Sequence, residues 1–314
     1  MSNILFTLAL IPVAGLLIFI YFNDKKEKEP FGFLVSLFFL GMATSVTALI
    51  SELIGTFVVA TVVPETSIAY AWIKAMLIVG PAEELGKYAV LRIRTWKHKN
   101  FNYSYDALVY AVFVSLGFAA LENVGYVVLG GGIITALMRM VTSVPGHACF
   151  AVFMGFFYSK AKYASLTNNK GKSAMFKALA IVVPIAIHGI YDAILMGAQA
   201  SGETGVMLVS IVVWIIFLIA LFVVSVILVI KSARNDFCIV TLPDEPQTQT
   251  IYRPAVMGTW TCTCGNSNQL NFCPKCGRSR PTIDNTWVCP KCGTISAYYF
   301  CGHCGTPRTT PVQQ

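Results

Sequence analysis

The sequence predicts an all-α polytopic membrane protein with about seven transmembrane helices, followed by small cysteine-rich modules. Of its 314 residues, 56% are hydrophobic and only 12% are charged, whereas soluble proteins carry about 25% charged residues. Long apolar runs alternate with short polar loops, as in chains that cross a bilayer repeatedly. Eight of the ten cysteines follow Trp260 in closely spaced pairs, a pattern typical of metal ligands rather than of disulfides.

The apolar runs are long enough to span the hydrocarbon core of a bilayer, which takes about 20 helical residues. The first run has no basic n-region and no small-residue cleavage site, so we expect a retained span rather than a cleaved signal peptide. In all we expect seven spans, at residues 3–22, 31–60, 67–93, 105–129, 133–158, 178–198 and 205–230.

Basic residues occupy every second loop. They follow the first, third, fifth and seventh spans, whereas the segments 61–66, 130–132 and 199–204 contain no lysine or arginine. By the positive-inside rule, the N-terminus then lies outside and the C-terminus lies in the cytoplasm. The net charge of +8 is accounted for by these loops, so a nucleic acid is not the expected partner.

Beyond the spans, the chain divides into a polar linker and a repeated cysteine motif. We expect a membrane domain over residues 1–234, a linker over 235–259, and two modules over 260–281 and 286–308. In each module a tryptophan precedes two cysteine pairs. A reducing cytoplasm keeps such thiols available, which agrees with the predicted topology.

The stretch from Gly80 to Lys87 places three charged side chains inside the third apolar run. An ionised group at the bilayer centre costs roughly 2.5–3.5 kcal/mol, so we expect Glu83, Glu84 and Lys87 to face the interior of the bundle. On a helix, Lys87 can reach either glutamate, at spacings of i,i+4 and i,i+3. Pro81 predicts a kink beside the paired carboxylates, where water could enter.

Three further spans carry polar groups that we expect at a similar depth. Counting residues along each span places His147 and His188 near the middle, with Glu122 and Asp192 somewhat nearer the outer side. His188 and Asp192 lie one helical turn apart and therefore share a face. Glu52 also lies within a span, but nothing at helical spacing pairs with it, so it is not included in the predicted site.

These groups suit the hydrolysis of a peptide bond inside the membrane. A carboxylate can act as a general base on water, and a histidine or a protonated acid can stabilise an oxyanion or protonate the leaving amine. Glutamate, histidine and aspartate are also zinc ligands, and a three-ligand site with an open position would activate water. The residues leave a glutamate-activated water and a metal-bound water as alternatives.

Four motifs occur in order on successive spans. They are Glu83-Glu84-x-x-Lys87, Phe118-Ala-Ala-Leu-Glu122-Asn123, Pro145-Gly146-His147-Ala148 and His188-Gly189-Ile190-Tyr191-Asp192. With these motifs the chain resembles the PrsW family of intramembrane proteases, within the superfamily that includes the CAAX prenyl endopeptidases. The resemblance implies that Glu83 and Glu84 are the catalytic pair. The full candidate site is Glu83, Glu84, Lys87, Glu122, His147, His188 and Asp192.

The cysteine modules resemble a tandem zinc ribbon, in which four cysteines hold a structural zinc ion. We expect one zinc ion at Cys262, Cys264, Cys273 and Cys276, and a second at Cys289, Cys292, Cys301 and Cys304. Because each module is too small to build a core, zinc would supply the folding free energy. Zinc in the membrane site is a further cofactor hypothesis.

We therefore predict an intramembrane endopeptidase that cleaves a membrane-anchored protein, which the resemblance suggests is a regulator of the anti-sigma-factor type. The expected partners are that substrate, the lipid bilayer, and a cytoplasmic protein bound by the zinc ribbons. The main alternative is a non-enzymatic membrane receptor or scaffold whose ribbons bind a protein partner. A transporter that uses the carboxylates as a relay is a third hypothesis, although no inverted repeat is evident.

Overall fold

The computed structural model describes residues 2–240, 260–268, 274–276, 287–296, 301 and 303–307. The chain divides into two compact units, residues 1–244 and 245–314, and each is described by itself. Within the described residues, the first unit holds the helices and the second holds four short strands.

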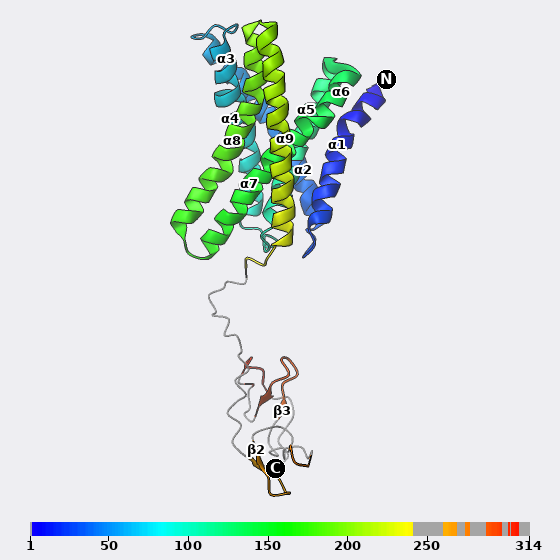
Figure 1. Ribbon diagram of the computed structural model, residues 1–314, viewed down its shortest axis with the longest axis vertical. Helices are drawn as coiled ribbons and strands as arrows, with labels where there is room; N and C mark the ends of the chain where they lie inside the picture. Colours follow the sequence, from blue (N-terminus) through cyan, green and yellow to red (C-terminus); the bar gives the residue numbers. More distant parts are fainter. Residues whose placement is uncertain are drawn as a thin grey trace. The chain divides into compact units, whose positions relative to one another are not determined.

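The first unit is helical throughout, as the hydropathy pattern predicts (Figure 1). Two of its segments, η1 and η2, have the wider turns of a π-helix. In chain order the elements are α1 (Ser2–Asn23), α2 (Phe31–Ala60), α3 (Ile68–Ile73), η1 (Lys74–Val79), α4 (Gly80–Thr95), α5 (Asp106–Tyr126), η2 (Val127–Gly131), α6 (Gly132–Val141), α7 (Ser143–Leu166), α8 (Lys170–Ser201) and α9 (Thr204–Arg234).

The number of spans agrees with the prediction. Six helical stretches of the described residues are each long and apolar enough to cross a membrane, with α6 and α7 counted as one stretch. The third predicted span is made of α3, η1 and α4, which follow one another without a break from residue 68 to residue 95. The expectation of an all-α polytopic protein with about seven spans is confirmed.

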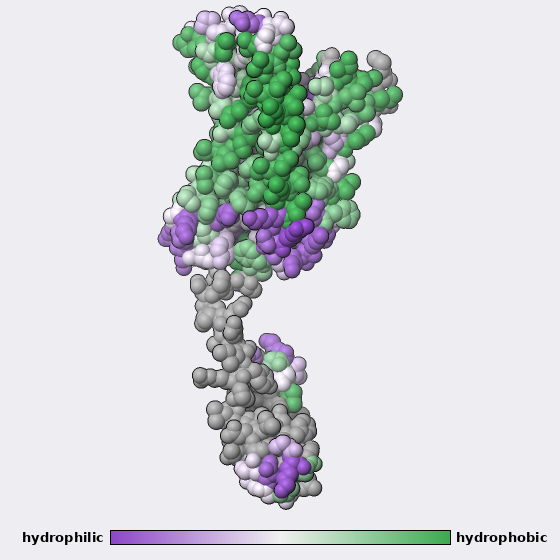
Figure 2. All heavy atoms as spheres, in the orientation of Figure 1, coloured by the Kyte–Doolittle hydropathy of each residue, from purple (hydrophilic) through white to green (hydrophobic). Residues whose placement is uncertain are grey.

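Helix α5 lies at the centre of the bundle. Its side chains from Asp106 to Ala120 are all buried, and helices α1, α2, α4 and α7 pack around it. The outer helices instead carry many exposed apolar side chains, which form the continuous hydrophobic surface seen in Figure 2. Acyl chains are as apolar as these side chains, so this surface is suited to contact with lipid.

Glycines allow the closest helix contacts around α5. A Cβ atom at Gly41 of α2 would overlap the carbonyl oxygen of Val114, and one at Gly117 of α5 would overlap the carbonyl oxygen of Phe38. Gly155 of α7 approaches the first turn of α5 in the same way. Small residues at such positions let helix backbones come close enough for extensive van der Waals contact.

The third span changes its geometry immediately before the paired glutamates. The π-helical segment η1 ends at Val79, and Pro81 then lies in the first turn of α4. Proline has no N–H group to donate, so an irregular turn at this point costs less than it would elsewhere. The predicted kink therefore takes the form of a π-helical segment.

Helix α8 meets the third span at this irregular turn. A Cβ atom at Gly189 would lie 3.0 Å from the Cα atom of Met76, and one at Gly80 would lie 3.1 Å from the carbonyl oxygen of Ile185. The two glycines thus permit a backbone approach that sets the glutamates of α4 beside α8.

Polar side chains gather at the end of the first unit where α1, α7 and α9 finish (Figure 2). The loops at this end, at residues 24–30, 96–105 and 167–169, lie beside the basic residues that the sequence places after alternate spans. The loops at the opposite end, at residues 61–67 and 202–203, contain no basic residue. The three-dimensional structure therefore has the charge asymmetry of a multi-pass membrane protein.

The second unit contains two small antiparallel hairpins. Strand β1 (Trp260–Thr261) pairs with β2 (Ser267–Asn268), and β3 (Trp287–Val288) pairs with β4 (Ile295–Ser296). The turn of each hairpin carries one cysteine pair. Hairpins of two residues per strand are too small to be stable alone, so another interaction must hold them.

Candidate active site and cysteine clusters

Three helices bring their polar side chains together inside the first unit. Glu83, Glu84 and Lys87 come from α4, His147 comes from α7 and His188 comes from α8, and all five are at least 96% buried. One donor atom from each of the two glutamates and two histidines lies within 4.8 Å of the others. These are the mid-span groups that the sequence places at one depth.

Lys87 lies among these donors. Its Nζ atom is 3.1 Å from Glu83 Oε2 and 2.8 Å from Glu84 Oε1, so it pairs with both carboxylates as the helical spacing predicts. The same ammonium is 3.2 Å from His147 Nδ1 and 3.9 Å from the centre of the Phe118 ring. The ammonium of Lys87 thus contacts two carboxylate oxygens, one imidazole nitrogen and an aromatic ring.

His147 is held between this cluster and α5. Its Nε2 atom is 2.9 Å from Glu122 Oε2, while its Nδ1 atom faces Lys87. A carboxylate can only accept a hydrogen bond, and the lysine ammonium can only donate one. We therefore assign the proton of the neutral ring to Nε2, which leaves the Nδ1 lone pair directed at the centre of the cluster.

Glu122 has a second partner on α6. Arg139 Nη2 lies 2.7 Å from the same Glu122 oxygen, and Arg139 Nε lies 2.8 Å from Asn123 Oδ1. Asn123 in turn donates to the carbonyl oxygen of Ala9 on α1. This chain of hydrogen bonds fixes the carboxylate that holds His147.

His188 is oriented in a similar way. Its Nε2 atom lies 3.4 Å from Asp192 Oδ2 on the next turn of α8, and its Nδ1 atom lies 3.0 Å from Glu84 Oε1. The ring of Phe150 stacks on the imidazole with a centroid separation of 4.6 Å. Both histidines therefore point Nε2 at an outer carboxylate and Nδ1 at the inner cluster.

The cluster is dry on one side and more accessible on the other. Glu84 and Lys87 are 0% and 1% exposed, whereas the side chains of Glu122, Asp192 and Arg139 are 21%, 24% and 16% exposed. The outer carboxylates and Arg139 therefore form the more accessible side of the cluster.

The donor set fits a zinc-like metal ion. Two carboxylates and two imidazoles are ligands that zinc accepts, and in metal sites the second nitrogen of a ligating histidine usually donates to a carboxylate. Glu122 and Asp192 occupy these outer positions. Glu84 Oε2 is buried and has no hydrogen-bond partner among the described residues, so it is free to serve as a ligand atom.

Two residues of this region received no role from the sequence. Arg139 is on a different helix from Glu122, so its ion pair could not be inferred from spacing along the chain. Glu52 of α2 lies close enough to Glu122, His188 and Asp192 to interact with them electrostatically. Its partners are likewise on other helices, which is why it was left out of the predicted site.

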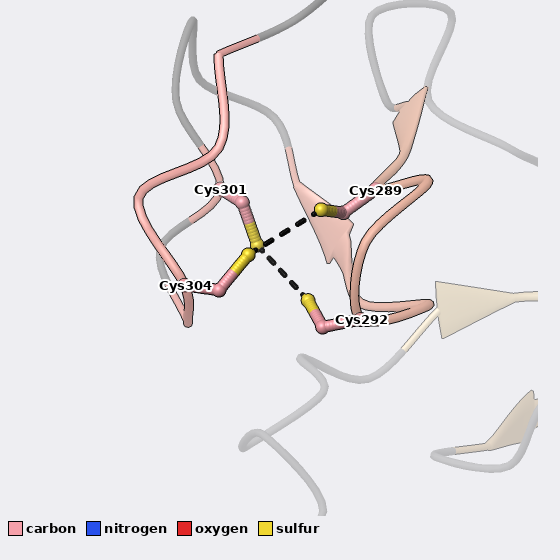
Figure 3. Close-up of side chains that lie close together, drawn as sticks. All are labelled: Cys289, Cys292, Cys301 and Cys304. Carbon is pink, nitrogen blue, oxygen red and sulfur yellow. Dashed lines mark hydrogen bonds between the residues drawn. The ribbon is translucent and has the colours of Figure 1, made fainter.

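In the second unit, four cysteines form one compact group. The side chains of Cys289, Cys292, Cys301 and Cys304 converge on one point (Figure 3). The Sγ atoms are 3.5 Å apart both between Cys289 and Cys304 and between Cys292 and Cys301. A tetrahedral zinc ion with Zn–S bonds of about 2.3 Å requires S···S separations of about 3.8 Å, so the group fits zinc closely.

Tight backbone turns hold these four thiols close together. Gly293 donates to the carbonyl oxygen of Cys289, Gly305 donates to that of Cys301, and both glycines have positive φ angles, of 72° and 68°. Such tight turns favour glycine, which has no Cβ atom to clash. Hydrogen bonds from the side chain and backbone of Thr306 lower the pKa of the Cys304 thiol to about 6, which favours the thiolate.

The first cysteine module is described in part. Cys262, Cys264 and Cys276 form a second compact group, with 3.6 Å between the Sγ atoms of Cys262 and Cys276. Cys273, the fourth predicted ligand, lies outside the described residues. Three of the four predicted ligands of this module are thus together, in positions that could bind a metal ion.

Comparisons with known proteins identify the family of the first unit. The model of the "PrsW family intramembrane metalloprotease" matches residues 29–241, which is more than half of the chain. The "Protease PrsW" of Geobacillus kaustophilus is 32% identical over 191 residues, covering 61% of this chain and 79% of the relative. The "Protease PrsW" of Bacillus subtilis is 33% identical over 184 residues, covering 59% of this chain and 79% of the relative.

The "Protease PrsW" of Clostridioides difficile is 33% identical over 196 residues, with 61% of this chain and 79% of the relative covered. No match was found among solved structures. The matched region contains every residue of the buried cluster, and the resemblance inferred from the four motifs is confirmed. This chain therefore belongs to the PrsW family of intramembrane metalloproteases.

Proposed function

We propose that this protein cleaves a membrane-anchored protein substrate, of the anti-sigma-factor type, at the buried cluster of the first unit. The observation that supports this most directly is the pair of imidazoles, each with Nε2 toward an outer carboxylate and Nδ1 toward the cluster of Glu83, Glu84 and Lys87. Membership of a metalloprotease family favours this reading over a receptor, a scaffold or a transporter.

We infer that His147 and His188 hold the metal through Nδ1, together with one of the two glutamates. Catalytic zinc sites keep three protein ligands and one open position, so the other glutamate remains free for proton transfer. When bound, the metal supplies a Lewis acid that polarises the scissile carbonyl and activates water. Glu122 and Asp192 act as positioning residues, because they orient the imidazoles.

The non-ligating glutamate carries the proton transfers. It removes a proton from water while the water oxygen bonds to the carbonyl carbon of the scissile peptide. It then delivers that proton to the amide nitrogen as the C–N bond breaks, and an amine leaves. The apolar walls formed by Phe118 and Phe150 limit the entry of other water and strengthen the electrostatic interactions inside the site.

Lys87 and a metal ion compete for the same donors. The ammonium contacts Glu83, Glu84 and His147 at distances of 2.8–3.2 Å. A divalent ion bound to these atoms would repel it and take its place. In the metal-free protein we assign Lys87 the role of neutralising the two buried carboxylates.

The two cysteine modules each bind one structural zinc ion in this proposal, and the module surfaces bind a cytoplasmic protein. All-cysteine sites leave no open position for a substrate, so they have no part in the reaction. The orientation follows the basic loops, with the N-terminus outside and the cysteine modules in the cytoplasm.

The decisive experiment uses purified full-length protein in liposomes with a single-span substrate protein. A variant with Cys262→Ser, Cys264→Ser, Cys289→Ser and Cys292→Ser disables both cysteine modules, so that loss and return of metal can be followed in the membrane site. Glu83→Gln and Glu84→Gln should each lower the cleavage rate by about 10²-fold or more, because general base or ligand function is lost. Treatment with a chelator should stop cleavage, and added zinc should restore it.

Glu203→Gln serves as the matched control, because this acidic residue lies in the loop before α9, at the other end of the bundle from the basic loops. It should cleave at the normal rate. Cleavage at the normal rate by both glutamate variants, when each is present in the membrane at normal abundance, would refute the assignment of the site.

A further inference from the structure

A second group of buried acidic side chains lies away from the active site, at the end of the first unit that carries the basic loops. Asp24 and Glu29 come from the loop between α1 and α2, Asp106 is the first residue of α5, and Asp236 follows α9. They are 1%, 3%, 0% and 9% exposed. Carboxylates are almost never buried to this extent unless they are paired.

The four carboxylates interact with one another. Asp236 acts electrostatically on Asp24, Asp24 acts on Glu29, and both Asp24 and Glu29 act on Asp106. The cation that acts on Asp24 is Lys28, but its ammonium donates to the backbone carbonyl oxygens of Tyr21 and Asp24. The hydrogen bonds of the Lys28 ammonium therefore go to backbone oxygens.

In two of the carboxylates, one oxygen accepts hydrogen bonds that fix the side chain, and the other oxygen has no hydrogen-bond partner among the described residues. Asp106 Oδ2 accepts from the backbone N–H groups of Asn102 and Tyr103, at 3.0 and 2.7 Å. Asp236 Oδ1 accepts from Ser104 Oγ and from the N–H group of Tyr105, both at 2.8 Å. The remaining oxygens are thus positioned before any ligand arrives.

Several oxygen atoms of this group have no hydrogen-bond partner among the described residues. The buried atoms without a hydrogen bond include both carboxylate oxygens of Asp24, Glu29 Oε2, Asp106 Oδ1 and Asp236 Oδ2. The amide oxygen of Asn102 and the hydroxyl of Tyr105 are likewise buried without a hydrogen bond. Asp24 is the clearest case, because its whole side chain is enclosed and neither oxygen is used.

We propose that this acidic cluster binds a hydrated divalent cation, with Mg²⁺ as the ion that fits it best. The oxygens available are carboxylate, amide and hydroxyl oxygens, which suit hard cations rather than zinc. The cluster is also wider than the compact groups of the described residues whose donor atoms lie within 4.8 Å of one another. Mg²⁺ keeps several water molecules and uses only one or two carboxylates directly, so it can bridge a wider cluster.

The cation would join three separate parts of the chain. Ile239 N–H donates to the carbonyl oxygen of Asn102 at 2.7 Å, and Tyr103 forms a β-bridge with Cys238. The segment after α9 is therefore already paired with the loop between α4 and α5. An ion held by Asp24, Asp106 and Asp236 would fasten the loop between α1 and α2 to this pair. The proposal does not depend on the protease activity.

The test measures thermal unfolding of full-length protein in detergent, after dialysis into buffer free of Mg²⁺ and Ca²⁺. Added MgCl₂ should raise the midpoint temperature in a saturable way, by about 5–10 °C at 100 times the dissociation constant. KCl at matched ionic strength should not. Asp24→Asn and Asp236→Asn should remove the response to Mg²⁺, and a parallel CaCl₂ titration identifies which ion is preferred.

Two controls separate this site from others. Glu203→Gln removes an acidic residue outside the cluster, and Glu83→Gln alters the intramembrane site, so both should keep the full Mg²⁺ response. Two results would overturn the proposal: an unchanged midpoint temperature of the unaltered protein at 10 mM Mg²⁺ or Ca²⁺, or an equal shift in Asp24→Asn. Either would mean that the buried carboxylates are satisfied by bound water or by protonation. If neither aspartate variant folds, Mg²⁺ binding is measured by equilibrium dialysis of the Glu83→Gln protein. Binding of about one Mg²⁺ ion per chain would support the site, and binding of much less would overturn the proposal.

Discussion

His147 and His188 show how single residues are prepared for metal binding in this protein. Each imidazole has an acidic residue at Nε2, namely Glu122 at 2.9 Å and Asp192 at 3.4 Å. Such outer hydrogen bonds fix the tautomer and orientation of a ligating histidine and make it a better donor. In the proposed site, Glu122 and Asp192 would therefore act by orienting the two histidines.

Replacement of Glu122 by glutamine tests this role. Glutamine can still accept a hydrogen bond from His147, but it loses the charge that pairs with Arg139 and supports the imidazole. We expect zinc affinity at the membrane site to fall by about 10–100-fold. Zinc binding is measured on the background with Cys262→Ser, Cys264→Ser, Cys289→Ser and Cys292→Ser, in which both cysteine modules are disabled. An unchanged affinity would show that the carboxylate at this position has no influence on the metal.

Replacement of Lys87 by methionine tests the competition between the ammonium and the metal. Removing one partner from a buried ion pair typically costs about 3–5 kcal/mol, because the other charge is left unpaired. Metal-free Lys87→Met should therefore be less stable than the unaltered protein, and added zinc should stabilise it more. The measurement is thermal unfolding with and without zinc. Equal zinc-induced shifts in both proteins would contradict the shared site.

At the scale of elements, α5 organises the bundle through close contacts with α2 and α7. These contacts replace the hydrophobic driving force that soluble helices use, which is weak between helices surrounded by lipid. Gly41, Gly117 and Gly155 allow backbone approaches that a larger residue would prevent. These close backbone contacts also fix how far each helix is shifted along its neighbour, and therefore the depth of the side chains in the site.

Replacement of Gly117 by alanine should push α2 away from α5. The added methyl group would overlap the carbonyl oxygen of Phe38, and overpacking of this kind typically costs about 1–3 kcal/mol. Gly125→Ala on the same helix is the matched control, since nothing lies within 4 Å of its Cβ position. Unfolding free energies in detergent compare the two. Equal stabilities would mean that the α2–α5 contact adapts without cost.

At the scale of the whole molecule, the chain combines a membrane unit with a separate cysteine-rich unit. The membrane unit has its own core and hydrogen-bond network. Among its described residues, the second unit has a small cluster of Cys289, Cys301 and Cys304, so we expect bound metal to stabilise its hairpins.

The Cys289→Ser/Cys292→Ser variant should therefore affect one unit only. We expect the variant to bind about one zinc ion fewer, and its tail to be cut faster by an added protease, because the hairpin around β3 and β4 loses its metal. The unfolding temperature of the membrane unit should not change. A lower unfolding temperature of that unit would show that the two units are energetically coupled.

The topology is also a property of the whole molecule. The basic loops lie at the end of the bundle where α9 finishes, so this end is expected in the cytoplasm. A reporter enzyme that is active only in the cytoplasm should therefore be active when it is fused after Lys231. A fusion in the loop at residues 202–203 should give the opposite signal. Reversal of both signals would overturn the proposed orientation.

The spans, the basic end of the bundle and the candidate site residues could all be predicted from the amino-acid sequence. Hydropathy is a sum over neighbouring residues, so the apolar runs could be read directly, and charged groups such as Glu83, Glu84 and Lys87 stand out inside them. Pairings within one helix were also predictable, since the spacing of His188 and Asp192 already places them one turn apart. Cysteine spacing likewise indicated which thiols belong together.

The faces that neighbouring helices present to one another could not be predicted in this way and are known from the three-dimensional structure. The ion pair of Arg139 with Glu122, the electrostatic contact of Glu52 with the site, and the acidic cluster around Asp24 all join separate helices or loops. Such contacts depend on the rotation and depth of each helix, which are set by packing at positions such as Gly41 and Gly189. A periodic pattern along one helix contains no information on that rotation relative to its neighbours, because every helix repeats with the same period.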